Sequence, residues 1–260
     1  MMTQQDHSLL APYSPNPSMA SWMITGVTLT FVIFWLLSEP LHQNPLYHSF
    51  ADQRSMFGVP HALNVLSNVV FCLAGIWGCT VIAKRTVKFA GISVIYMFFF
   101  AGIFFTGLGS AYYHWSPDNS TLMWDRLPMS VGFMAFSAVI VSERCKESLG
   151  YKLFPWLLFI GVLSVVYWIW QNDLRPYYVV QFGSMLVLPL IIWRFSGPGT
   201  CWLWLTVALY ALAKLLELFD HQVLQMTEGV ISGHTLKHLA AAAGAFMMVV
   251  KINTHVAKRQ

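Results

Sequence analysis

Ionisable residues stand near the ends of apolar segments at three places in this chain. They are His114 in GSAYYHW, Asp125 in WDRLP, and the pair His234 and His238 in SGHTLKHL. An ionisable residue placed in an apolar, membrane-like segment is costly, and it marks a candidate functional site. Imidazole and carboxylate groups are metal ligands, so the four residues predict a metal site if their segments converge.

The two C-terminal histidines have the spacing of paired metal ligands. His234 and His238 are four positions apart, so a helix places both on one face. The same spacing provides two ligands to one zinc ion in other proteins. His114 would supply a third imidazole, leaving the fourth zinc position open for water, as in catalytic sites. Zinc lowers the pKa of bound water to about 7 and polarises carbonyl groups.

Two further residues could assist a water at this site. Asp125 follows His114 across a predicted turn and could accept the water's proton or orient a ligand histidine. Ser110 precedes His114 by one helical turn and could donate to a developing oxyanion. Gly107 and Gly109 would let a neighbouring helix approach closely.

Each of these residues also has a simpler structural explanation. A single HxxxH spacing is weak support for a metal site. Asp125 could be a helix N-cap ahead of Leu127 and Pro128. Ser110 could bond to the helix carbonyl one turn earlier. It is the occurrence of all of them at one end of the predicted helices that favours the metal site.

A second polar group lies near the seventh apolar stretch. Lys214 and Glu217 have the i,i+3 spacing of an ion pair, which we interpret as structural. His221 lies four positions after Glu217, so a continuous helix would place both on one face, and Asp220 precedes His221. Alternatively, Glu217 or His221 supports the metal site or competes as a ligand.

The stretch YHSFADQRSMFGVPHALNVLSN is unusually polar for this chain. Asn64, Ser67 and Asn68 could make hydrogen bonds between helices. The functional alternative is an outer loop folded over the site, with an ion at Asp52. The 19 Phe, 11 Trp and 10 Tyr residues suit lipid-facing packing and would also suit an acyl-chain tunnel.

Composition identifies the environment that must position these residues. The 260 residues are 57% hydrophobic and 10% charged, whereas soluble domains carry roughly 25% charged residues. Eight stretches approach the length of about 20 residues that a spanning helix needs: 21–37, 62–83, 89–113, 122–142, 153–170, 177–193, 202–219 and 231–250. We therefore predict an all-α polytopic membrane bundle with no water-soluble domain. The short loops hold the net charge of +4, which does not indicate nucleic-acid binding.

Charge and cysteine usage complete this prediction. No Lys or Arg precedes Arg54, so the stretch 21–37 is interpreted as a retained membrane helix rather than a secretory signal. The four cysteines have no CxxC spacing and are interpreted as small core residues. Positive residues alternate loop by loop, which predicts cytoplasmic termini and places the site near the non-cytoplasmic face. The positive loops and tail contain Lys84, Arg85, Lys88, Arg144, Lys146, Lys152, Arg194, Lys251, Lys258 and Arg259.

Four motifs together resemble the alkaline ceramidase family, which belongs to a larger group of seven-helix membrane hydrolases that includes adiponectin-type receptors. They are NVLSN, GLGSAYYH, WDRLPM and GHTLKHL, in the family's order, and the similarity covers about residues 45–250. The resemblance implies a zinc amidase that cleaves the N-acyl bond of a ceramide to a sphingoid base and a fatty acid. It also implies that His114, His234 and His238 bind zinc, while Ser110 and Asp125 assist the water.

The resemblance sets the predicted domain boundaries. An N-terminal segment, 1–45, adds one transmembrane helix to a seven-helix core at 46–251, and a cytoplasmic tail follows at 252–260. Eukaryotic members of the family also have an acidic calcium site before the first core helix. This chain offers Asp52 there but has His61 where an acidic ligand is expected.

Three hypotheses follow for function. The first is a zinc-dependent membrane hydrolase acting on a ceramide-like lipid, with an ester-cleaving enzyme of the same group as a variant. The second is a lipid-sensing receptor or scaffold with structural zinc, for which His221 could be a fourth ligand. The third is a transporter with a proton relay, which the concentration of polar residues at one side disfavours.

Overall fold

The computed structural model describes residues 17–84 and 91–257, and these residues form helices and no strands. In chain order the elements are α1 (Pro17–Leu37), η2 (Pro45–His48), α2 (Ala62–Leu66), α3 (Val69–Ala83), α4 (Ile92–Trp115), α5 (Asn119–Arg144), α6 (Glu147–Gln171), α7 (Arg175–Tyr178), η3 (Val179–Gly183), α8 (Ser184–Arg194), α9 (Thr200–Leu218), α10 (Asp220–Met226) and α11 (Gly233–Ala257). The element η2 is a 3₁₀ turn and η3 is a π-helical turn between α7 and α8.

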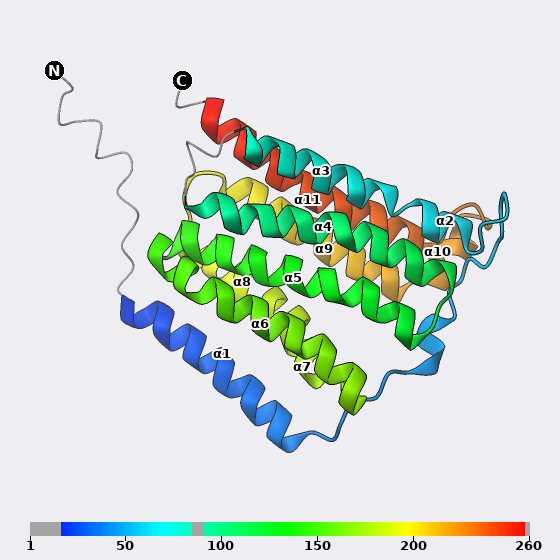
Figure 1. Ribbon diagram of the computed structural model, residues 1–260, viewed down its shortest axis with the longest axis horizontal. Coiled ribbons are helices and arrows are strands. Elements are labelled where there is room, and N and C mark those ends of the chain that lie inside the picture. The colour runs from blue at the N-terminus through cyan, green and yellow to red at the C-terminus, as the bar shows by residue number, and fades with distance from the viewer. Residues whose placement is uncertain (1–16, 85–90, 258–260) are drawn as a thin grey trace.

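The long helices lie side by side in one bundle (Figure 1). Six of them pack in a ring in which α3 contacts α4, α4 contacts α5, α5 contacts α8, α8 contacts α9, α9 contacts α11, and α11 contacts α3. Helix α6 packs on the outside of α5, and α1 stands at the edge of the bundle, touching α8 and η3. The interior that this ring encloses is lined by side chains from all six helices.

The surface of the bundle is apolar enough to face lipid. Six segments of the described chain are long and apolar enough to cross a membrane: 62–83, 92–115, 147–171, 175–194, 200–218 and 233–254. Large apolar side chains such as Trp77, Phe105 and Trp193 are exposed on them, as expected where lipid replaces water. The predicted all-α membrane bundle is confirmed.

The number of spans remains a prediction. Helix α5 is long enough to span but carries four charged residues, and it is not among the six segments. The part of α1 that qualifies as apolar, Thr25–Leu37, is shorter than a span. Helices thus occupy all eight predicted stretches, two of which are divided (α2 with α3, and α7 with η3 and α8). The crossings by α1 and α5 rest on the sequence argument.

Close contact between α4 and α5 positions the residues around His114. A Cβ atom at Gly109 would lie 1.9 Å from the Trp124 carbonyl oxygen, so no side chain fits there. A Cβ atom at Gly107 would lie 2.6 Å from Cys72 Sγ on α3. The predicted role of these glycines in close helix packing is confirmed, and it brings the end of α4 against both neighbours.

The opposite end of the bundle is held by a buried ion pair. Lys251 Nζ lies 2.6 Å from both Glu143 carboxylate oxygens and donates to the Tyr96 hydroxyl at 3.1 Å. The sequence placed Lys251 beside the tail, but α11 continues to Ala257 and buries this residue, because the ion pair compensates its charge. The predicted loop charges at 85, 88, 258 and 259 lie outside the described residues. All four cysteines, including Cys79 near this end, are free.

Candidate metal centre

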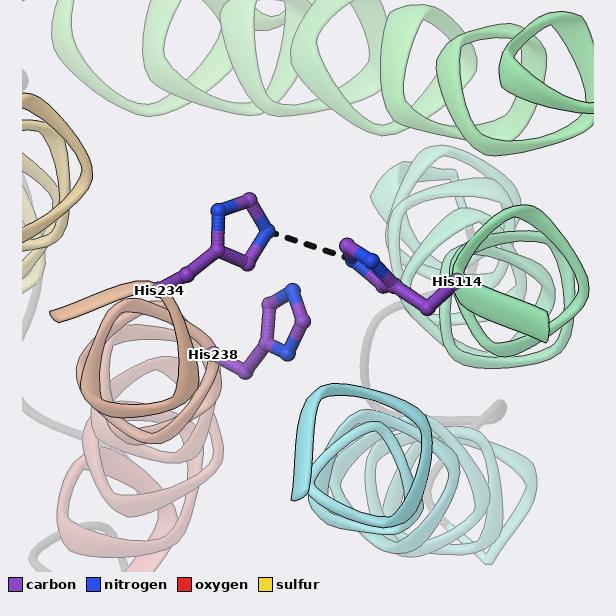
Figure 2. Close-up of side chains that lie close together, drawn as sticks. All are labelled: His114, His234 and His238. Carbon is purple, nitrogen blue, oxygen red and sulfur yellow. Dashed lines mark hydrogen bonds between the residues drawn. The ribbon is translucent and has the colours of Figure 1, made fainter. Parts of the chain in front are cut away.

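Three histidines meet at one end of the bundle, as the sequence predicted. His114 comes from the last turn of α4, and His234 and His238 come from the first turns of α11 (Figure 2). One ring nitrogen from each lies within 4.8 Å of the others, and all three side chains are buried. His114 Nε2 and His234 Nε2 are 3.2 Å apart. This group can hold a metal ion.

The free ring nitrogens fit such an ion. His114 Nδ1 and His238 Nε2 are buried and have no hydrogen-bond partner in the part of the chain described. Buried polar atoms are almost always satisfied, so two orphaned imidazole nitrogens in one cluster indicate a missing acceptor of their lone pairs. Three histidines with an open fourth position match the donor set of catalytic zinc.

Ser67 orients one of these histidines. Its hydroxyl lies 2.7 Å from His238 Nδ1 and donates to the Asn64 carbonyl oxygen at 3.1 Å. Because the hydroxyl proton is committed to Asn64, Ser67 accepts a hydrogen bond from His238 Nδ1–H. The lone pair of His238 then resides on Nε2, which is the unpartnered atom. A hydrogen bond on the far nitrogen is the usual way in which a metal-binding histidine is held in place.

The segment between η2 and α2, residues 49–61, covers the histidine cluster and is called the outer segment. The Phe50 ring lies 4.5 Å from that of His114 and 4.8 Å from that of His234, measured between centroids. His61 Nδ1 lies 3.0 Å from the His114 backbone oxygen and donates to it. The Asp220 carboxylate accepts from the backbone N–H of His234 at 2.7 Å. The same carboxylate accepts from the N–H that follows Phe50, so it ties the cover to the start of α11.

Asp125 and Ser110 lie on the wall of one cavity that His238 also lines. Both are buried, Asp125 with 7% of its surface exposed and Ser110 with 3%. The alternative in which Asp125 is a helix N-cap is wrong. Asp118 caps α5, accepting from the Thr121 N–H at 2.8 Å, so Asp125 lies inside the helix. The structure thus brings all five predicted site residues to one end of the bundle.

The cavity has a polar end at the histidines and an apolar body. Its volume is about 730 Å³, within the range of lipid- and drug-sized binding sites. The body is lined by apolar side chains of the ring helices, including Phe99, Phe136, Leu188 and Ala245. From Asp125 to Phe136 the wall follows eleven residues of α5, or about 16 Å along the helix axis.

A charged network stands at the polar end. Lys214 and Glu217 form the predicted i,i+3 ion pair, and Lys237 Nζ lies 2.6 Å from Glu217 as well. The Tyr47 hydroxyl donates to Glu217 at 3.3 Å. The prediction that His221 shares a helical face with Glu217 is wrong. The helix is interrupted at 219 between α9 and α10, and His221 is exposed and does not belong to the group of three histidines.

Three residues of this end were not singled out by sequence patterns. Phe50 covers the cluster, Lys237 Nζ lies 3.3 Å from His234 Nε2, and Arg126 lines the cavity. Lys237 directly precedes His238, and Arg126 directly follows Asp125. This adjacency to motif residues could have identified both from the sequence. Phe50 had no such signal, because an isolated aromatic residue in a loop is common.

Asp52, the predicted ion ligand, is paired within the chain. Arg54 Nε and Nη2 donate to its two carboxylate oxygens at 2.8 and 2.7 Å. Arg54 also donates to the Val230 carbonyl oxygen at 3.0 Å, which joins the outer segment to the start of α11. The hydrogen bonds from Arg54 hold the pKa of Asp52 below its usual range. The carboxylate is therefore already neutralised by a cation of the chain.

Comparison with known proteins adds an independent observation. A family model described as Ceramidase matches residues 58–196, which is more than half of the chain. The matched region includes Ser110, His114 and Asp125 and ends before the two histidines of α11. A search of curated proteins finds no match.

Proposed function

The chain belongs to the ceramidase family, and from this membership we propose a zinc-dependent membrane amidase that cleaves the N-acyl bond of ceramide or a related lipid. Hydrolysis breaks the C–N bond, adds the hydroxyl of water to the acyl carbon and returns a proton to the nitrogen. The products would be a sphingoid base, or the corresponding amine, and a fatty acid. The coarser conclusion, a membrane hydrolase acting on a lipid, follows from the family itself.

The observation that carries this proposal is the position of the histidine cluster at the polar end of a long apolar cavity. His238 belongs to the histidine cluster and also lines the cavity. An acyl chain lying in the cavity would leave its amide group beside His238, Ser110 and Asp125. Proximity of this kind contributes a large part of the rate in enzymes.

Each residue then has a defined task. His114, His234 and His238 would hold zinc, which when bound supplies a water of lowered pKa and polarises a carbonyl group. Asp125 accepts the proton of the attacking water and passes it to the leaving nitrogen. Ser110 donates a hydrogen bond to the acyl oxygen as negative charge develops there. Ser67 keeps His238 in the ligating orientation.

The membrane orientation is part of the proposal. Exposed Lys84, Lys146 and Lys152 lie at the end of the bundle opposite the histidines, and positive loops are typically cytoplasmic. We therefore propose cytoplasmic termini and a site near the non-cytoplasmic face. Arg144 and Lys251 are buried at the same end and contribute less to this argument.

The test combines metal analysis with a lipid panel. The purified full-length protein should contain zinc and release fatty acid from N-acyl lipids, and His234→Ala should lose both properties. His221→Ala is the matched control, because His221 is an exposed histidine outside the cluster. It should retain zinc and activity.

The outcomes separate the hypotheses. Hydrolysis by His234→Ala at the normal rate would show that the mechanism is wrong. Cleavage of O-acyl but not N-acyl lipids would make the protein an esterase of the same group. Loss of zinc in His221→Ala, without any lipid hydrolysis by the wild type, would favour structural zinc in a receptor or scaffold.

A further inference from the structure

Arg126 is a buried cation held among aromatic rings. Its guanidinium carbon lies 4.3 Å from the centroid of Trp168, 4.9 Å from that of Tyr177 and 5.4 Å from that of Tyr47. Only 4% of the residue is exposed. The rings attract the cation through their quadrupoles, which fixes the guanidinium in one place.

No carboxylate pairs with Arg126 in the part of the chain described. Its Nη1 is buried and has no hydrogen-bond partner there. The two other buried arginines of the described chain have acceptors: Arg175 donates to the Asp173 carboxylate, and Arg144 donates to the Pro198 carbonyl oxygen. A buried charge normally has a hydrogen-bonded partner. Nη1 of Arg126 is therefore a buried donor without an acceptor among the described residues.

The surroundings of Arg126 favour an anionic acceptor. Five charged groups of the chain line the cavity, and all belong to its polar end: Asp125, Arg126, Lys214, Glu217 and Lys237. Glu217 is shared by the two lysines, and Asp125 is the one other carboxylate. The cations exceed the carboxylates by one before any metal ion is added, so the cavity is electrostatically complementary to an acidic ligand.

The position of Arg126 relates this acceptor to the amide. Arg126 follows Asp125 directly in α5, so the two Cα atoms are about 3.8 Å apart. Both residues line the same cavity, so one ligand could reach both side chains. A guanidinium presents a planar fork of donors that matches a carboxylate.

We propose that Arg126 binds the acidic head group of the substrate, and that the substrate is an N-acyl lipid with a carboxylate close to its amide, as in an N-acyl amino acid. This inference rests on the proposed amidase function and specifies its substrate class. Hydrolysis would yield the fatty acid and the amino-acid head group, with no further reactant than water. The neutral head group of a ceramide would leave Arg126 without an anionic partner.

The experiment compares two probes that differ in one group. N-palmitoylglycine carries a carboxylate, and N-palmitoylglycinamide has a neutral amide at the same place. For the zinc-loaded full-length protein we expect kcat/KM for release of palmitate to be at least tenfold higher with the acid. Arg126→Gln should reduce this ratio at least tenfold, mainly through KM. Arg126→Lys should retain part of the ratio, because lysine keeps the positive charge but lacks the two parallel donors of a guanidinium.

A binding measurement separates this proposal from the amidase proposal. The acid should raise the unfolding temperature of the wild-type protein more than the neutral amide does, and Arg126→Gln should remove the difference. If this holds but neither probe is hydrolysed, the head-group site stands and the amidase function fails.

Other results would overturn the head-group site. Equal binding and equal kcat/KM for the two probes in the wild type would show that Arg126 only clamps the aromatic rings together. An unchanged ratio in Arg126→Gln would lead to the same conclusion. If Arg126→Gln does not fold, the wild-type comparison and Arg126→Lys still decide the question.

Discussion

Replacing Gly109 by alanine should damage the site through the packing of two helices. The added Cβ would lie 1.9 Å from the Trp124 carbonyl oxygen and 2.6 Å from the carbonyl carbon. Real Cβ atoms essentially never approach closer than 3.0 Å, so α4 and α5 must separate locally by about 1.1 Å. Backbone atoms cannot rotate away as a side chain can. The shift therefore reaches Ser110 and Asp125, which directly follow Gly109 and Trp124.

The size of the effect follows from this displacement. A 1 Å misplacement of reacting groups can cost about 100-fold in rate, so we expect kcat/KM to fall by about two orders of magnitude. Overpacking in a tight interior costs about 1–3 kcal/mol, against about 1 kcal/mol gained from the better helix propensity of alanine. The unfolding temperature should therefore fall as well, and this second measurement does not depend on the substrate.

Gly132→Ala is the matched control for the stability effect of Gly109→Ala. Gly132 lies on α5 and faces the same helix pair, but its added Cβ would meet only Ile103 Cδ1, at 4.0 Å. Its stability should be unchanged or higher by about 0.4–1 kcal/mol. The assay is fatty-acid release in detergent, with zinc content and thermal unfolding measured on the same samples. If Gly109→Ala matched the wild type in rate and Gly132→Ala in unfolding temperature, the argument from close helix packing would be refuted.

Three other changes test separate parts of the structure. Ser67→Ala removes the hydrogen bond to His238 and should weaken zinc binding about 10- to 100-fold, measured by competition with a chelator; an unchanged affinity would contradict the orienting role. Ala245→Phe fills part of the apolar cavity and should shift the substrate preference toward shorter acyl chains, and equal loss for all chain lengths would argue against a tunnel. Arg54 lowers the pKa of Asp52 through its hydrogen bonds, so the stability from this pair is present above the ordinary carboxyl pKa and is lost as the pH falls below it. Wild type and Arg54→Gln should thus converge in unfolding temperature as the pH falls below the ordinary carboxyl pKa, and a constant difference would refute this.

The sequence was sufficient for the class of fold and for the cluster of histidines. Apolar stretches of spanning length are a local property, and they predict helices because no other regular structure satisfies the backbone of a single segment in lipid. The i,i+4 spacing of His234 and His238 likewise fixes a shared face without any knowledge of packing. The turn between α4 and α5 then required that His114 and Asp125 lie at the same end.

The tertiary structure decided the contacts between residues that are far apart in the chain. Ser67 and His238, which are 171 positions apart, meet only because α11 packs against α3. The sequence showed Asp125 as a residue that could cap a helix, and the helix start at Asn119 removed that alternative. The sequence shows Arg126 next to Asp125 as another charged residue. Whether Arg126 has a carboxylate partner depends on which residues of other helices pack around it, and only the tertiary structure shows this. Local pattern determines which groups a helix presents, whereas burial and pairing are set by its neighbours.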